Sequence, residues 1–316
     1  MRAYIRLHRE TIVLSLTLLL LIIATMKPTI TLQREITSHL IFIDVTQSMN
    51  VTDMSVNGHP VSRLEYTKHL LKKTIKQLPC HSRVGLAIFF KADVALLYTP
   101  VETCRNLSLL EDTIDHLEWR MASRGNSNIR LGLQSIAVRL VTIDVPVNVV
   151  FITDGDEAAP LNAINKTNLS GWIGGSDWLL VGVGGEKPSP IPKLDANNKR
   201  VGIWSIYSIK IAPGIAVNDG PNSARDESYA TAPYEYYLSR LDDRYMEELA
   251  ADIKGNYLKA SSPKALTHAM LNQKVSYKDQ TEFNLSWLFA LGALISIITL
   301  YIADMPNVYQ KWSKTP

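Results

Sequence analysis

The feature that most constrains the fold is a series of short, almost wholly apolar runs separated by longer segments with helical periodicity. The clearest runs are residues 39–45, 146–152 and 177–184, and helical segments such as 62–79 and 129–140 lie between them. Strands that are apolar throughout are buried on both faces, and their alternation with helices is typical of a parallel sheet covered on each side. The sequence therefore predicts an α/β protein with a doubly wound, mostly parallel sheet.

Two further features refine this core, which we place at residues 38–273. Residues 83–90 and 92–99 are apolar runs joined by a very short turn, and they predict an antiparallel hairpin. Residues 185–235 then break the alternation with a proline-rich stretch. This stretch is too long for an ordinary loop, so we interpret it as an elaboration inserted into the core.

Both ends of the chain carry apolar segments. Residues 285–303 contain no charged side chain and predict a transmembrane helix, with Trp287 and Tyr301 near its two ends. Residues 11–26 also lack charge, but they are short for a membrane span, and a cleavable signal peptide is the alternative. Bulky Met26 stands where a signal peptidase site requires a small residue, which favours an uncleaved anchor.

Basic residues set the expected orientation of these two anchors. Arginines precede the first apolar segment and lysines follow the second, so both tails, residues 1–10 and 304–316, are expected in the cytoplasm. Residues 27–284 would then face the outside. The sequence thus predicts one exported domain held by two transmembrane helices.

The two cysteines lie close to the expected hairpin. Cys80 precedes the first hairpin run and Cys104 follows the second, so pairing of the runs brings both to the same end. A disulfide between them suits an oxidising compartment outside the cytoplasm. Two separate buried thiols remain the alternative.

Oxygen-bearing side chains gather where the predicted strands end and where a helix begins. Asp44, Thr46 and Ser48 follow the first strand, Ser127 precedes the helix at 129–140, and Asp154 follows the strand at 146–152. In open α/β sheets, ligands bind at the carboxyl ends of the strands. Two carboxylates and three hydroxyls, with no histidine or cysteine, are typical ligands of a hard divalent cation. We expect Mg²⁺, with Ca²⁺ and Mn²⁺ left open.

The residues DVTQS, GNSN and TDGD, in this order, resemble the metal-ion-dependent adhesion site of von Willebrand factor A (VWA) domains. The resemblance implies a VWA fold in which Thr46 and Ser48 ligate the metal directly and Ser127 replaces the usual threonine. Asp44 and Asp154 would act directly or through water. It also implies a free coordination position for an acidic group of a partner protein.

The whole arrangement of anchor, A domain and anchor is similar to the bacterial Bat aerotolerance proteins. The stretches DVTQSMNVTDM, PVSRLEYTKH and LPCHSRVGLAIF resemble the MxaL type, a VWA family of methanol-oxidation gene clusters. This resemblance implies a bacterial inner-membrane protein with a periplasmic domain that assists maturation or calcium insertion of a methanol dehydrogenase. It also implies a MoxR-type ATPase system as a partner. A general Bat-type membrane scaffold is the alternative.

The remaining function classes find little support in the sequence. Basic and acidic residues number 33 and 30, which leaves no excess positive charge for nucleic acid. A phosphatase of the aspartyl-phosphate type needs a second aspartate where Thr46 stands. The glycines at 182–185 lack a complete nucleotide-binding fingerprint. We therefore expect a binding module rather than an enzyme.

Overall fold

The computed structural model describes residues 2–122, 127–158, 161–162, 166–169, 175, 177–208 and 229–312. The chain divides into two compact units. The larger unit is Glu35–Tyr277, and the smaller unit combines the two ends of the chain, Met1–Arg34 and Lys278–Pro316.

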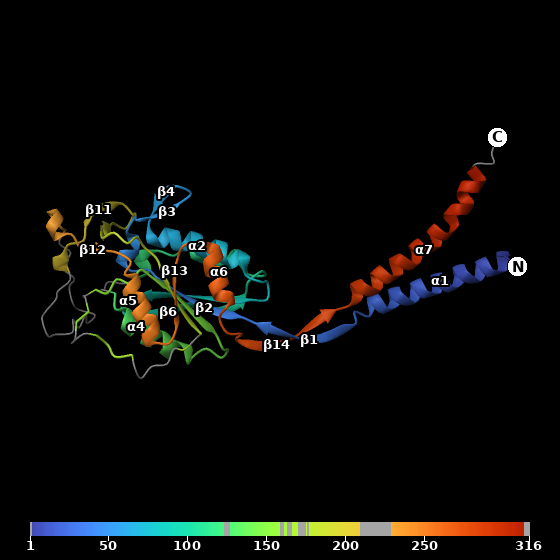
Figure 1. Ribbon diagram of the computed structural model, residues 1–316, viewed down its shortest axis with the longest axis horizontal. Coiled ribbons are helices and arrows are strands. Elements are labelled where there is room, and N and C mark those ends of the chain that lie inside the picture. The colour runs from blue at the N-terminus through green and yellow to red at the C-terminus, as the bar shows by residue number, and fades with distance from the viewer. Residues whose placement is uncertain are drawn as a thin grey trace. The chain divides into compact units, whose positions relative to one another are not determined.

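The larger unit is built on a central six-stranded sheet, as expected from the alternating apolar runs (Figure 1). Five neighbouring strands are parallel, and only the last is antiparallel to its neighbour. In spatial order, the strands are β13 (Asn256–Lys259), β8 (Trp178–Gly182), β7 (Asn148–Thr153), β2 (Ser38–Asp44), β5 (Arg83–Phe90) and β6 (Asp93–Glu102). The mostly parallel sheet predicted from the sequence is therefore confirmed.

Helices bury both faces of this sheet. Alternate residues of β2 point to opposite sides, so that Leu40 and Phe42 belong to one core while Ile41 and Ile43 belong to the other. Three helices pack on the second of these cores, namely α2 (Arg63–Gln77), α3 (Leu107–Asp115) and α6 (Pro263–Leu271). The first core is covered by α4 (Ile129–Leu140) and α5 (Asp243–Asp252) (Figure 1).

Local sequence explains where these helices begin. Ser62 caps α2 because its hydroxyl accepts the backbone N–H of Glu65, and Asn128 caps α4 in the same way. Ser262 likewise accepts the N–H of Ala265, with Pro263 in the first turn of α6. These caps fix the starts of helices whose apolar faces then pack on the sheet.

A short hairpin precedes α2. The chain leaves β2 through a 3-10 turn, η1 (Gln47–Asn50), and forms β3 (Met54–Val56) and β4 (His59–Val61). Its turn residues Asn57 and Gly58 both have positive φ, as a tight two-residue hairpin turn requires. This hairpin was not predicted, because its strands are only three residues long.

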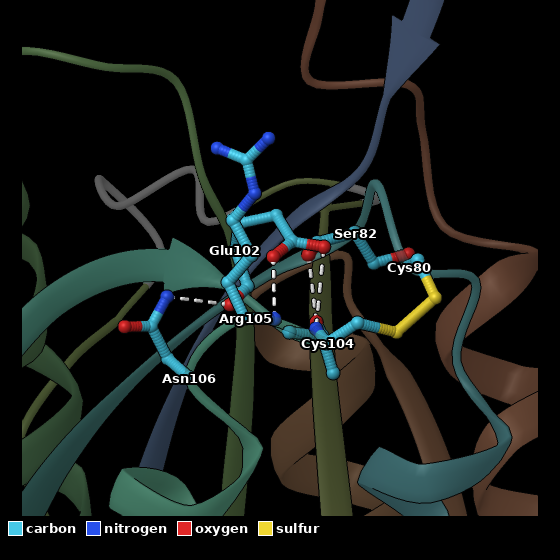
Figure 2. The surroundings of a disulfide bond; sticks show 7 residues. Cys80, Ser82, Glu102, Cys104, Arg105 and Asn106 are labelled. Atoms are coloured by element: carbon cyan, nitrogen blue, oxygen red, sulfur yellow. Dashed lines mark hydrogen bonds between the residues drawn. A yellow bond between two sulfur atoms is a disulfide. The ribbon is translucent and has the colours of Figure 1, made fainter.

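The hairpin of β5 and β6 carries the disulfide. Cys80 and Cys104 are bonded, with their Cα atoms 4.9 Å apart (Figure 2). The backbone around the bond is also tied down, because the hydroxyl and N–H of Thr103 both donate to the Ser82 carbonyl. The Glu102 carboxylate accepts the N–H groups of Cys104 and Arg105 (Figure 2). The register of β6 shifts twice against β5, between Val84 and Ala87.

The elaboration forms small antiparallel pieces beside the main sheet. One pair is β10 (Pro192–Leu194) with β11 (Arg200–Ile203), and the other is β9 (Ser189–Pro190) with β12 (Leu238–Ser239). Val51, Ile191 and Trp204 form its small core, against which Tyr237 packs. Two short turns, η3 (Ile206–Ser208) and η4 (Pro233–Glu235), complete the described part, while residues 209–228 lie outside it. A third turn, η2 (Trp119–Met121), contacts this region through the Trp119 indole, which donates to Asn198.

The end unit holds two long helices, α1 (Arg2–Thr25) and α7 (Ser286–Trp312), which lie side by side (Figure 1). Gly292 of α7 lies close to Leu20 of α1. The strands β1 (Thr29–Ile36) and β14 (Tyr277–Asn284) pair with each other, a ribbon that the sequence did not predict. Over the described residues, neither these helices nor any other combine the length and apolarity that crossing a bilayer requires. The two membrane spans stay predictions.

Candidate metal site

The five predicted ligands lie at the carboxyl ends of the strands or at the start of a helix. Asp44 ends β2, Thr46 and Ser48 lie in the turn that follows, and Asp154 follows β7. Because β2 and β7 are parallel neighbours with Ile43 opposite Ile152, their carboxyl ends meet at one edge of the sheet. All five side chains are buried, including Ser127 just before α4.

The turn after β2 is organised around the Asp44 carboxylate. One oxygen, Oδ1, accepts the backbone N–H of Thr46 at 2.8 Å, and the other, Oδ2, accepts the Thr153 hydroxyl at 2.7 Å. The hydroxyl oxygens of Thr46 and Ser48 are 3.2 Å apart. Asp44 and Thr46 are thus linked through the Thr46 backbone, and Thr46 and Ser48 are linked through their hydroxyls.

Ser127 is held against the loop that carries Asp154. Its carbonyl accepts the N–H of Ala158 at 2.9 Å. The Glu157 carboxylate accepts the first two helical N–H groups of α4, those of Ile129 and Arg130. The described chain therefore joins the Ser127 and Asp154 loops, although the preceding Gly125 and Asn126 lie outside the described residues.

These residues fit a hard divalent cation. Within the described part of the chain, the buried Oγ of Ser127 has no hydrogen-bond partner, which is unusual for a buried hydroxyl. The 3.2 Å between the Thr46 and Ser48 oxygens is close to the spacing of about 3.0 Å expected between adjacent ligands in an octahedron with bonds of about 2.1 Å. A set of oxygens alone also suits Mg²⁺ better than zinc.

Burial and like charge strongly affect the acidic side chains here. Burial, and then the nearby charge of Asp154, raise the pKa of Asp44 to about 7, against the opposing hydrogen bonds from Thr153 and Thr46. The pKa of Asp156 is raised to about 7 by burial and by Asp154, against hydrogen bonds from Ser239 and Tyr237 and the charge of Arg63. A cation bound among these carboxylates would relieve both effects.

A buried arginine that the sequence analysis missed completes the charge arrangement. Arg63 opens α2 and is fully buried, although the first residue of a helix is usually exposed. Its Nη1 contacts Asp154 Oδ2 at 2.7 Å, and its Nη2 contacts Asp53 Oδ2 at the same distance. The ligand Asp154 therefore has a permanent cationic partner.

The glycines that follow β8 make room for this arginine. A side chain at Gly184 would meet the Arg63 guanidinium, and one at Gly185 would meet the Asp53 carboxylate. Gly184 also has a φ of +146°, which favours glycine. Packing against an ion pair thus explains the last two glycines of the run at residues 181–185, whereas Gly182 faces Tyr257 and Leu241. The sequence did contain a signal for this ion pair. Asp53 and Arg63 flank the two strands of a hairpin whose turn is Asn57-Gly58, and pairing of the strands brings them together.

Across the described ranges, no three side chains of the histidine, cysteine, aspartate and glutamate types come together as metal ligands. The predicted set has only two carboxylates and depends on hydroxyls for the rest. Trp178 and Trp204 pack into the cores, while Trp172 lies outside the described residues.

Comparison with known proteins supports the fold. Neither a model of any protein family nor any curated protein sequence matches the chain. Among solved structures, an aerotolerance-related membrane protein from Bacteroides fragilis is 18% identical, with 75% of this chain and 98% of that chain covered and a TM-score of 0.50. BatB from Bacteroides thetaiotaomicron is 19% identical over the same shares, also with a TM-score of 0.50.

A further neighbour is the ArnB paralog VWA2 from Sulfolobus acidocaldarius, at 12% identity, with 79% of this chain and 48% of that chain covered and a TM-score of 0.40. At these identities, likeness shows the fold alone. The chain therefore shares the mostly parallel α/β fold of the two Bacteroides proteins.

Proposed function

We propose that this chain is a non-enzymatic binding module that holds a divalent metal and uses it to bind an acidic group of a partner protein. The observation that supports the proposal is that the five predicted ligands, Asp44, Thr46, Ser48, Ser127 and Asp154, are all buried. In addition, the parallel strands β2 and β7, which precede two of them, end at the same edge of the sheet. The unpartnered Oγ of Ser127 supports it, because a ligand there would satisfy that hydroxyl. Mg²⁺ is the metal that we expect.

The protein's own groups would hold and orient the ligand set. Thr46, Ser48 and Ser127 offer hydroxyl oxygens, while the carboxylates of Asp44 and Asp154 are kept in place by hydrogen bonds from Thr153 and Arg63. The metal would supply a positive charge that attracts a partner's carboxylate. Among the described residues of this arrangement we identify no nucleophile paired with a general base, and we therefore propose binding rather than catalysis.

We further propose that the module faces the periplasm and is anchored in the bacterial inner membrane, with both termini in the cytoplasm. The uncharged segments 11–26 and 285–303 and the basic tails support this topology. A neighbour of the same fold is described as an aerotolerance-related membrane protein. The disulfide between Cys80 and Cys104 is what an oxidising compartment favours.

The finer proposal concerns the partner. From the motif resemblance, we propose that the module assists maturation, including calcium insertion, of a periplasmic methanol dehydrogenase beside a MoxR-type ATPase. The alternative is a general Bat-type membrane scaffold, which the fold of BatB supports equally well. Capture of apo methanol dehydrogenase by the immobilised chain, in Mg²⁺ but not in chelator, would favour the first role.

The test of the metal site is calorimetric titration of Mg²⁺, Ca²⁺ and Mn²⁺ into the purified full chain. We expect Asp44→Asn to weaken binding by roughly 100-fold or more, since even groups that only orient ligands contribute 10–100-fold. Asp93→Asn, at the exposed first residue of β6, is the matched control and should bind like the parent. A parent chain that binds none of the three ions would refute the proposal.

A further inference from the structure

Arg63 is the most completely bonded side chain in the described structure near the metal site. Its Nε and Nη2 donate to the Asp53 carboxylate, and its Nη1 donates to Asp154 Oδ2. The two remaining N–H groups reach Ser239, one to the hydroxyl at 2.8 Å and one to the carbonyl at 3.2 Å. All five donors of the guanidinium are thus used, and the side chain is fully buried.

The surroundings hold Arg63 in this position. Asp53 Oδ2 also accepts the N–H of Gly185 at 2.9 Å, so the ion pair is tied to the loop after β8. Gly184 lacks the side chain that would displace the guanidinium. The Arg63 charge is buried, all its donors are satisfied, and glycine leaves the space that it occupies. Arg63 is therefore a fixed part of the site and not a surface contact.

Arg63 acts on Asp154 in two ways. It fixes the carboxylate, because Oδ2 is bound to Nη1 while Oδ1 accepts the N–H of Asp156 at 3.1 Å. It also places one positive charge beside a predicted metal ligand. That charge, which Asp53 offsets only in part, repels a divalent cation and makes the potential that the loaded site presents to an incoming acidic group more positive.

We propose that Arg63 is a positioning and charge-balancing residue that weakens binding of the metal alone and strengthens binding of a carboxylate to the metal-loaded site. This inference rests on the proposed function. It means that the site is adjusted to release its metal readily without a partner and to hold it firmly when an acidic side chain completes the coordination. Metal and partner therefore bind cooperatively.

The test measures the two affinities separately on the full chain in mild detergent. Calorimetry gives the affinity for Mn²⁺, and the paramagnetic broadening of the acetate methyl signal gives the affinity of acetate for the Mn²⁺-loaded protein. For Arg63→Gln we expect Mn²⁺ to bind about tenfold tighter and acetate to bind about threefold weaker. A purely structural role would weaken both or change neither.

Three variants accompany this measurement. Arg63→Lys keeps the charge and should stay within a few-fold of the parent in both affinities. Lys68→Gln removes a buried cation on the same helix that bonds Glu65 and the Asp115 carbonyl, and it should change neither affinity. Asp53→Asn removes a negative partner of Arg63, so Mn²⁺ should bind more weakly and acetate more tightly. This reversed effect tests the inference even if Arg63→Gln does not fold.

The outcomes separate the two proposals. The inference is supported if Arg63→Gln binds Mn²⁺ more tightly and acetate more weakly. It is also supported if Asp53→Asn binds Mn²⁺ more weakly and acetate more tightly. A parent that binds Mn²⁺ and acetate, with variants that shift both affinities in the same direction or not at all, overturns the inference and leaves the proposed function standing. A parent that binds no Mn²⁺ overturns the proposed function, and this inference falls with it.

Discussion

The two ends of the central sheet both bury polar side chains, but they do so in different ways. At the carboxyl edge, Asp44 and Asp154 keep their charges close together beside Arg63. At the amino edge, the same strand β2 begins with Ser38 and His39, whose hydrogen-bond partners Ser276 and Gln273 are neutral.

Around His39 and Asn148, hydrogen bonds at the amino edge join neutral partners. His39 Nδ1 is 3.1 Å from Gln273 Oε1, and the Gln273 amide donates to the carbonyls of Val149 and Asp177. Asn148 donates to the Lys274 carbonyl in the same way. The Cys80–Cys104 bond closes this edge covalently. The difference teaches that one edge stabilises the fold, whereas the other retains unfavourable charge that a ligand can relieve.

Removing the disulfide should have the largest effect that distinguishes the two edges of the sheet. Replacing both Cys80 and Cys104 with serine should lower the free energy of unfolding by about 3 kcal/mol, because the bond closes a loop of about 25 residues. Denaturation with and without reductant measures this for the parent. Mn²⁺ affinity should not change, and a large loss of metal binding would show that the two edges are not independent.

Acid should lower the stability of the folded chain through protonation of His39 at the amino edge. Burial lowers the pKa of His39 to about 4, against the hydrogen bond between Nδ1 and the amide oxygen of Gln273, while the unfolded chain has the ordinary value of 6.5. The unfolded state therefore binds the proton first, and stability is lost as pH falls from 6.5 towards 4, by roughly 3 kcal/mol in total. His39→Gln should flatten this part of the stability profile in urea titrations. An unchanged profile would contradict the assignment.

At the carboxyl edge the same change of pH should act with the opposite sign. The pKa of Asp44 in the folded chain, about 7, lies above its ordinary value of 3.8, so the unfavourable charge is fully present above pH 7 and is relieved between pH 7 and 3.8. In chelator at pH 8, Asp44→Asn should raise the free energy of unfolding by about 1–2 kcal/mol, since the amide replaces only some of the hydrogen bonds. This gain in stability should shrink on acidification. A loss of stability of Asp44→Asn at pH 8 would contradict an unfavourable charge on Asp44 in the folded chain.

The smallest effect compares two buried threonines. Thr103→Val removes the hydroxyl that donates to the Ser82 carbonyl and should destabilise the fold by about 1 kcal/mol without affecting metal binding. Thr153→Val is the matched variant at the other edge, where the hydroxyl orients Asp44. It should weaken Mn²⁺ binding by roughly tenfold. Equal effects of both variants on metal affinity would remove the distinction between the edges.

Much of the fold could be predicted from local patterns. The helical segment 129–140 is reproduced by α4, because an amphipathic segment capped by Asn128 carries its own start signal. The hairpin of β5 and β6 and the capping role of Ser262 follow equally local rules. The ribbon of β1 and β14 could not be predicted, since its strands are 241 residues apart at their nearest ends and lack a strong apolar pattern.

The candidate site shows the same limit. Asp44, Thr46 and Ser48 could be grouped because they share one turn, and Asp154 because parallel strands bring their ends together. Arg63 could not be included, since an arginine at the start of a helix is ordinarily solvated. Its burial depends on Asp53, Asp154 and Ser239, which come from segments 10, 91 and 176 residues away. A charge buried by distant partners leaves no periodic signal.

The irregular register of β6 bears on how this protein behaves at high concentration. β6 is an edge strand, and an edge with regular unpaired backbone groups can recruit the edge of another molecule. Here Gly85 packs against Pro100, which has no N–H to offer, and the strand bulges opposite that glycine. The β6 edge of the sheet is thus a poor template for strand pairing with another molecule. Since parallel sheets assemble slowly, this irregular edge protects the chain from aggregation while it folds.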